Sequence, residues 1–207
     1  MATGTKKNNA RIREEQKDNI LKAARTLFAH KGYSDTTMTE IAAAAQVSYG
    51  LAYHYFADKE AIFTQIIEAA LQSSMALMQH VREIPGTPWD HLRWLTTQML
   101  EGAHREPEIF MVVMQAFISD SIPRSARESA WKSGVVSLET IKQMIVEGQR
   151  AGQVVEGDPD HLASAFSWCI QGMALDMGFM NRRPDTAPPL PVSGYPTADD
   201  LLRMLKA

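Results

Sequence analysis

Four residues in the segment 48–54 have the types and the spacing of a surface that contacts nucleic acid. Tyr49 and Tyr53 are four residues apart, and so are Gly50 and His54, so that each pair shares one face of a helix. The tyrosine and histidine side chains can form hydrogen bonds, and no acidic residue stands among the four. A short, stiff, uncharged helix face of this kind suits insertion into the major groove of DNA.

Two short helices joined by a tight turn must position this face. The first is predicted by an apolar stripe at i, i+3, i+4 and i+7. Thr37 precedes the stripe and Glu40 lies three residues further on, which is the spacing of a capping box. Gln46 and Val47 form the break between the two helices. The residues of the stripe are Met38, Ile41, Ala42 and Ala45.

The second helix begins at Ser48, a good N-cap residue. It is too short to be stable alone. It therefore requires support from beneath, which we expect Val47, Ala52 and Phe56 to provide. That packing leaves the tyrosine, glycine and histidine face outward.

This segment resembles the DNA-binding region of the TetR family of transcriptional regulators. The resemblance rests on Glu40-Ile41-Ala42, Val47-Ser48, Gly50, Tyr53-His54-Tyr55-Phe56 and Lys59-Glu60, and extends back to Ile20–Ala24, Leu27-Phe28 and Gly32-Tyr33. It covers roughly the first third of the chain, and the remainder is similar mainly in helical character.

Two residues depart from the family pattern. Gln46 stands where the family usually has glycine at the turn, and a positive φ there would cost on the order of 1 kcal/mol. Ala52 stands where a larger apolar residue is usual, so the second helix is expected to sit closer to its support. Neither departure removes a group that contacts DNA.

The resemblance implies a homodimeric regulator, most simply a repressor that binds a palindromic double-stranded DNA operator and is released by a small apolar or amphipathic effector ligand. Two recognition helices must then lie about 34–36 Å apart. The helix that follows Asp58 would transmit ligand occupancy by shifting. The resemblance implies that DNA is contacted by Ser48, Tyr49, Gly50, Tyr53 and His54, and that phosphate is bound by Thr37, Thr39 and Lys59.

Composition and length set the broad class. The chain has 207 residues, 45% hydrophobic and 22% charged, ordinary values for a globular protein. Its single cysteine, Cys169, allows no internal disulfide, which favours a reducing, cytoplasmic compartment. The polar residues 1–15 do not resemble a signal peptide, and the lack of an uncharged apolar run of about 18 residues predicts no membrane span.

Positive charge is concentrated at the N-terminus. The net charge is −3 overall, but +2 for residues 1–60 and −5 for residues 61–207. Lys6, Lys7, Arg11 and Arg13 precede any acidic residue, so this arm is expected either to reach DNA or to be a solvated tail.

The chain is predicted to be all-α, because no strand pattern or internal repeat appears. Residues 13–73 are expected to form a helix-turn-helix DNA-binding domain, and residues 74–207 a helical bundle for ligand binding and dimerisation. A first helix is predicted from about 15 to 31, an irregular loop at 182–196 and a last helix at 198–206. The helix opened by Pro123 is expected to point Trp131, Val135, Leu138, Ile141 and Ile145 inward.

The helix that begins at Pro159 is apolar almost all round. A helix of this kind must be covered on every side, which favours a two-fold interface over a buried helix in a monomer. The predicted interface stripe is Phe166, Ile170, Met173 and Met177, and the residues predicted to pack in the chain's own bundle are Leu162, Trp168 and Leu175.

Met and aromatic residues gather in the C-terminal part. Ten of the twelve methionines lie between Met75 and Met204, together with all four tryptophans. Such side chains suit a cavity for variable apolar ligands, although most are expected to be ordinary core. Asp176 could contact a ligand, form an interface hydrogen bond or lie at the surface. The residues predicted to line the cavity are Trp94, Met99, Phe110, Met114, Trp131 and Trp168.

Catalytic and metal chemistry have little support. Cys169 lies among apolar neighbours, where a thiol is inert. The six histidines show no metal-ligand spacing, and no phosphate-binding glycine loop occurs. We therefore expect no enzyme activity, cofactor or metal. Two alternatives remain: a ligand-independent interaction protein with a DNA-binding head, and an all-α enzyme with a vestigial DNA-binding segment.

Overall fold

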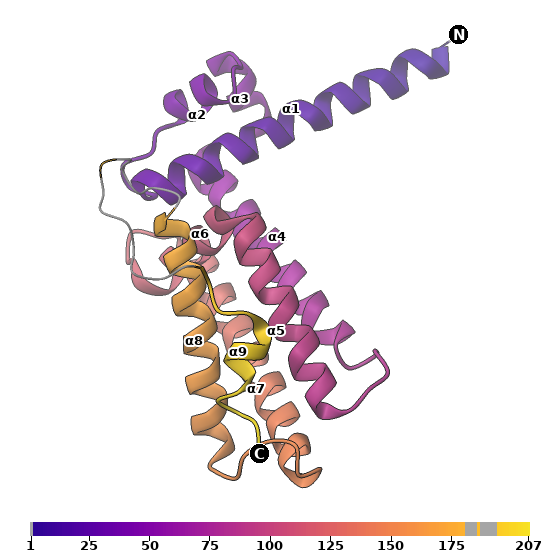
Figure 1. The fold of residues 1–207 in the computed structure, drawn as a ribbon. Coiled ribbons are helices and arrows are strands. Elements are labelled where there is room, and N and C mark those ends of the chain that lie inside the picture. The colour runs from indigo at the N-terminus through magenta and orange to yellow at the C-terminus, as the bar shows by residue number, and fades with distance from the viewer. Residues whose placement is uncertain (1, 181–185, 187–193) are drawn as a thin grey trace.

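The computed structural model describes residues 2–180, 186 and 194–207 (Figure 1). Within them the chain is helical without a strand, apart from one isolated antiparallel bridge between Val154 and Lys206. The all-α prediction is therefore confirmed. The helices are α1 (Ala2–Lys31), α2 (Met38–Ala44), α3 (Tyr49–Tyr55), α4 (Lys59–His80), α5 (Pro88–Arg105), α6 (Pro107–Ile118), α7 (Arg124–Arg150), α8 (Pro159–Met180) and α9 (Ala198–Leu202).

Helix α1 is about twice as long as predicted. It begins at Ala2 instead of near residue 15, and its N-terminal half projects away from the rest of the molecule (Figure 1). An i, i+4 ion pair of 3.2 Å between Arg11 and Glu15 supports this half. The positively charged arm is thus a helical extension of the head and not an irregular tail.

The two short helices begin at the predicted capping residues. The Thr37 hydroxyl accepts a hydrogen bond from the Glu40 N–H at 3.3 Å, and the Glu40 carboxylate accepts one from the Thr37 N–H at 2.9 Å. The Ser48 hydroxyl accepts from the Leu51 N–H at 3.2 Å. Each contact satisfies a backbone donor that a helix end leaves free, so the capping predictions are confirmed.

The turn between α2 and α3 is strained at Gln46. Its φ is +56°, the only positive φ of a non-glycine residue in the described part of the chain. A side chain in this region is held there by the surrounding structure at a cost in free energy. The glycine-like geometry expected from the resemblance is present without the glycine.

Replacing Gln46 by glycine should therefore stabilise the protein. We expect the free energy of unfolding to rise by up to about 1 kcal/mol, since glycine adopts this φ without a Cβ clash. Urea denaturation followed by circular dichroism measures it. Gln46→Ala keeps the Cβ and is the matched control, which should gain nothing; equal stability of the two variants would contradict the strain.

Two hydrophobic cores lie along the molecule, and α4 runs through both. Its first half buries Ile62 and Phe63 in a core shared with α1–α3, α6 and the start of α7. Its last turns bury Met78 in a second core with α5, α8, α9 and the rest of α7. The boundary expected near residue 73 falls within this continuous helix, so the DNA-binding head and the body share an element.

Helix α6 holds the head to the body at two places. The Gln115 side chain accepts a hydrogen bond from the Tyr33 N–H at 3.1 Å and donates one to the Phe28 carbonyl at 2.8 Å. At the other end of α6, Glu106 forms an ion pair of 3.4 Å with Arg25 of α1. Both contacts fall on the C-terminal half of α1 or directly after it, just before the helix-turn-helix.

The predicted inner face of α7 is only half right. Ile141 and Ile145 are buried, but Trp131, Val135 and Leu138 are 57%, 65% and 38% exposed. Small residues occupy the inner face of the N-terminal half instead: Ala126 and Ala130 are buried in the first core. Close packing on these alanines turns the large apolar side chains outward.

The predicted interface stripe of α8 is wrong, and the predicted inner face is right only in part, because Leu162 packs against the second core. Phe166 and Ile170 are buried in the second core and Met177 in a small cluster with Ala103 and Ala174, and the half-buried Met173 packs against both. Trp168, predicted to pack in the chain's own bundle, is 69% exposed. An all-round apolar helix carries no periodic stripe that could distinguish the two faces.

The C-terminal helix α9 starts with the predicted Thr197–Asp200 capping box but ends at Leu202, earlier than expected. Most of the loop predicted at 182–196 lies outside the described residues. By length and composition α4 could cross a membrane, the one such helix among the described residues. In the fold, its residues Ile62, Phe63 and Ile67 are buried in the first core.

Candidate nucleic-acid interface

Helix α3 lies beside α2 at the end of the molecule opposite the C-terminus (Figure 1), and its predicted face is exposed to solvent. Tyr49 is 54% exposed and Tyr53 41%, and Gly50 and His54 are exposed as well. On the supporting side Ala52 is fully buried, above the buried Phe56 and the half-buried Val47. The small side chain of Ala52 lets α3 sit close to the head.

The two tyrosines of this face form a pair. Their ring centroids are 4.6 Å apart at an interplanar angle of 53°. Hydrogen bonding to Tyr49, together with desolvation, raises the pKa of Tyr53 above its ordinary value of 10.0. On the neighbouring side of α3, the Tyr55 hydroxyl donates to the Gln16 side chain of α1 at 2.9 Å, which ties α3 to α1.

Lys59 has a different environment from the one expected. Its ammonium donates to the backbone carbonyls of Tyr33, Ser34 and Thr36 at 2.8, 3.0 and 2.9 Å, and lies 4.6 Å from the Tyr33 ring centroid. An ammonium has three N–H donors, and all three are used. The prediction of a direct phosphate contact therefore needs correction: Lys59 fixes the α1–α2 connection instead.

The start of α2 is reinforced in the same way. Thr37 and Thr39 are exposed, but the Thr37 hydroxyl is engaged with Glu40, and Lys31 forms an ion pair with the same carboxylate. Hydrogen bonds from Lys31 and Thr37 lower the pKa of Glu40 to about 2. The ionised Glu40 therefore stabilises the fold above pH 4.5, the ordinary pKa of its carboxyl group. This stabilisation is lost as the pH falls towards 2.

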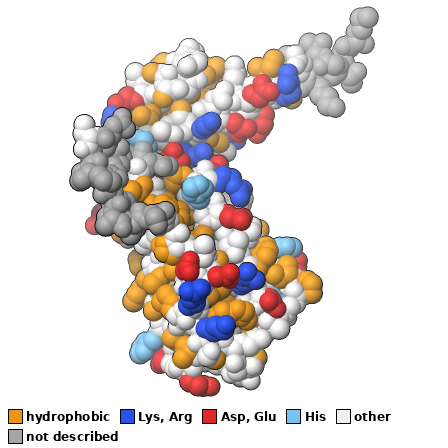
Figure 2. Space-filling model, in the orientation of Figure 1, with side chains coloured by type: hydrophobic (Ala, Val, Ile, Leu, Met, Phe, Trp, Pro, Cys, Tyr) orange, Lys and Arg blue, Asp and Glu red, His pale blue; other side chains and the backbone are white. Residues whose placement is uncertain are grey.

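Three of the described cations of the head are already used within the chain. Arg25, Lys31 and Lys59 are each engaged with groups of the chain itself. Figure 2 shows Lys and Arg side chains along α1, interspersed with acidic ones. Arg13 and Lys22 of α1 are exposed. The positive field expected near DNA therefore depends mainly on α1 and its N-terminal extension.

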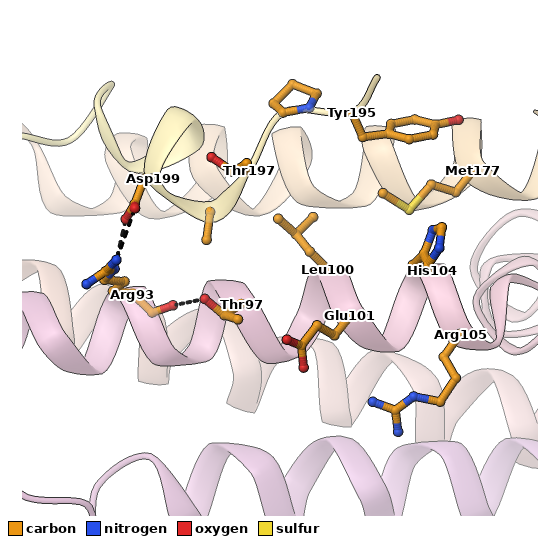
Figure 3. Close-up of a pocket in the computed structure, with 12 residues that line it drawn as sticks. Arg93, Thr97, Leu100, Glu101, His104, Arg105, Met177, Tyr195, Thr197 and Asp199 are labelled. Atoms are coloured by element: carbon orange, nitrogen blue, oxygen red, sulfur yellow. Dashed lines mark hydrogen bonds and ion pairs between the residues drawn. The ribbon is translucent and has the colours of Figure 1, made fainter. Parts of the chain in front are cut away.

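The body carries a groove of about 820 Å³ between α5, α8 and the segment that precedes α9 (Figure 3). Leu100 and Met177 contribute apolar surface. His104 and Tyr195 stand near Met177 at one end, and the ion pair of Arg93 with Asp199, 2.8 Å, lies at the other. This volume is suitable for a small molecule, and the lining is mixed apolar and polar.

A second groove of about 500 Å³ shares Tyr195 and Pro196 with the first. It is lined by Met173 and Asp176 of α8, and the Tyr195 hydroxyl donates to the Asp176 carboxylate at 3.0 Å. Of the roles open to Asp176 from the sequence, the structure shows a surface one: it is an exposed hydrogen-bond acceptor for the segment 194–197.

The six residues predicted to line a ligand cavity do not come together, and neither groove contains any of them. Trp94 and Met99 pack against the second core, and Phe110 packs against a small cluster around Ala103. The others are the half-buried Met114 and the exposed Trp131 and Trp168. Composition alone does not distinguish residues of the core from residues that line a cavity. The polar groove residues at the end of α5, such as His104, follow no sequence pattern that predicts a ligand site.

Helix α3 is capped at its start, exposes one face and packs with the other on the head. This is the arrangement of a helix-turn-helix DNA-binding protein. Residues 20–71 match the family model described as bacterial regulatory proteins, tetR family. The segment extends from the middle of α1 into α4 and contains the whole α2–α3 unit.

Relatives of known name share this unit, and some share more. The HTH-type transcriptional regulator AcrR of Shigella flexneri is 27% identical over 171 residues, which cover 82% of this chain and 71% of AcrR. The HTH-type transcriptional regulator HbdR of Aromatoleum sp. (strain CIB) is 42% identical over 60 residues, 29% of this chain and only 26% of HbdR.

The fold also matches solved structures over most of the chain. The crystal structure of the MbdR regulator from Azoarcus sp. CIB aligns with a TM-score of 0.73 at 23% identity, covering 83% of this chain and 90% of MbdR. Residues 20–71 therefore form a DNA-binding segment of the tetR family type, and the chain is similar over most of its length to helix-turn-helix transcriptional regulators that carry this segment.

Proposed function

We propose that this regulator is a homodimeric repressor that binds a palindromic DNA operator through α3 and is released by a small apolar or amphipathic ligand. The observation that carries the DNA-binding part is the exposed face of Tyr49, Gly50, Tyr53 and His54 on a fully supported helix. Such a protein acts in the cytoplasm, where it can reach DNA. A role as an enzyme has no comparable support.

Base and phosphate contacts are assigned to different parts of the head. Ser48 and the exposed residues of α3 enter the major groove. Thr37, Thr39 and α1 approach the phosphates, while Lys59 acts indirectly by holding the α1–α2 connection. Phosphate contacts set the register, and only the groove contacts distinguish sequences.

The dimer interface is proposed on the outward faces of α7 and α8. The two helices follow each other through a short connection, run antiparallel (Figure 1), and are bridged by a 2.7 Å ion pair between Lys142 and Asp160. Trp131, Val135 and Leu138 lie at i, i+4 and i+7 on α7. On α8 the exposed large apolar residues are Trp168 and Phe179, with the exposed Gly172 between them.

A second copy of the chain is the occupant that fits this face. Exposed tryptophan and leucine side chains on adjacent helices form an apolar patch that monomeric proteins rarely leave uncovered. Two-fold pairing would cover it on both copies at once. It would also hold two α3 helices at one separation, as a palindromic site requires.

The larger groove is proposed as the effector site, because it adjoins the contacts that hold the head. Leu100 and His104 lie in the last turns of α5, and the next helix begins after Glu106, which pairs with Arg25 of α1. A ligand that displaces the end of α5 would strain this ion pair. It would thereby move α1 relative to the body.

Selection of duplexes from a random-sequence library tests the proposal. The purified protein should enrich an inverted repeat whose half-sites lie one helical turn apart, and should bind it at least about 10³-fold more tightly than random duplex at physiological salt. Enrichment of no sequence would refute the proposal, and enrichment of single half-sites would refute the dimer.

The effector site can be tested by filling it. Small apolar and amphipathic compounds that raise the melting temperature of the native protein should fail to do so with Leu100→Trp, whose indole would occupy the groove. Gln72→Trp, at an exposed position of α4, is the matched control. Equal shifts in the native protein and Leu100→Trp would place the binding site elsewhere.

The helical arm should contribute a salt-dependent part of DNA affinity. Deleting residues 1–13 removes Lys6, Lys7, Arg11 and Arg13. The slope of log affinity against log salt should flatten by roughly 0.9 for each phosphate that these side chains neutralise in one chain, measured by fluorescence anisotropy. An unchanged slope would show that the arm does not contact DNA.

A further inference from the structure

The recognition face of α3 lacks the side chains that read bases by paired hydrogen bonds. Between Ser48 and Tyr55, all within the described residues, there is no Arg, Lys, Asn, Gln, Asp or Glu. Guanine is most often read by Arg or Lys, and adenine by Asn or Gln, in bidentate contacts to the base edge. The side chains of this helix can therefore form only single, and not bidentate, hydrogen bonds to a base.

The face offers apolar ring surface instead. Tyr49 and Tyr53 are 54% and 41% exposed, and their centroids are 4.6 Å apart, so the two rings act as one patch. In the major groove only thymine carries an apolar group, its C5-methyl. A paired aromatic surface matches that group and no other feature of the groove.

Gly50 allows this patch to come close. A Cβ built at Gly50 meets no atom within 4 Å, and the backbone there does not have a positive φ, so neither packing nor conformation requires glycine. Glycine also disfavours a helix. Its place next to Tyr49 is explained if the outside partner, and not the protein interior, needs the space.

We infer that α3 recognises thymine C5-methyl groups in the operator, which pack against the rings of Tyr49 and Tyr53. The inference rests on the proposed function, because it requires α3 to enter the major groove. It names what the helix reads there: the positions of thymines in each half-site.

Deoxyuridine substitution tests the inference directly. Deoxyuridine differs from thymidine only by the C5-methyl and keeps the same base pairing. In the consensus duplex selected from the random library, changing one contacted thymine should weaken binding about fourfold, and the symmetric pair about sixteenfold, from the transfer free energy of one methyl.

Two variants connect this weakening to the rings. Tyr49→Ala should reduce the difference in affinity between the thymine and deoxyuridine duplexes, because one of the two rings that cover the methyl groups is gone. Tyr53→Phe keeps the ring and removes only the hydroxyl, so it should retain the full deoxyuridine effect. Circular dichroism of both variants checks that they fold.

The outcomes separate this inference from the proposed function. If a consensus is selected but no deoxyuridine duplex binds more weakly, the inference is overturned and DNA binding stands. The same holds if 7-deazaguanine, which removes the N7 acceptor, is the only substitution that matters, because His54 would then be the reader. If no consensus is selected, the proposed function itself fails.

Discussion

Simultaneous replacement of Tyr53 and His54 by alanine should abolish sequence-specific DNA binding while leaving the fold intact. Both side chains are exposed, whereas the buried Ala52 and Phe56 support the helix from the other side. The interaction of each side chain with DNA is worth about 1–3 kcal/mol, so the pair should cost about 2–6 kcal/mol in each half-site. Affinity would then fall to the level of non-specific binding.

A titration against the selected duplex, at fixed salt, measures this decrease, and thermal unfolding measures stability. Exchange of Gln72 and Gln79 for alanine on the exposed side of α4 is the matched control. Retained specific affinity would show that α3 does not read the operator. A collapsed fold would show that these two side chains support the head.

Two residues of α8, only two positions apart, should give opposite results when changed to glutamate. Trp168→Glu should leave a folded monomer, because Trp168 is 69% exposed on the proposed interface. Ile170→Glu should unfold the body, because Ile170 is 1% exposed in the second core. Burying an unpaired carboxylate costs several kcal/mol in either place.

Sedimentation at micromolar concentration and circular dichroism separate the two results. Operator binding should fall in Trp168→Glu, because a monomer holds one half-site and does not gain from linking two. Lys132→Glu, an exposed site on α7, controls for added negative charge. A native protein that sediments as a monomer would contradict the dimer, and a dimeric Trp168→Glu would place the interface elsewhere.

The parts of the fold that were predictable are those set by local chemistry. Thr37 and Glu40, or Thr197 and Asp200, satisfy each other's free groups within four residues, so a capping box needs no knowledge of the tertiary structure. The outward face of α3 was likewise readable, because Ala52 lies on the opposite side of a short helix.

The other features depend on partners distant in sequence. The three carbonyls that hold Lys59 come from residues 33–36, and their convergence is a property of the folded connection. On α8, Trp168 and Ile170 are both large and apolar, so burial alone distinguishes them. The groove is formed by polar and apolar residues from three segments, and no single segment marks it.

Because α4 runs without a break through both cores, a change in its tilt in the body moves its other end in the head. Its 22 residues span about 33 Å at 1.5 Å per residue. A tilt of about 5° at the body end therefore displaces the head end by roughly 3 Å, and in a symmetric dimer the two heads move in opposite senses. Their separation would change by roughly 6 Å against the about 34–36 Å that consecutive major grooves require. A ligand that shifts side chains in the body by no more than the width of a methyl group could thus put both recognition helices out of register with DNA.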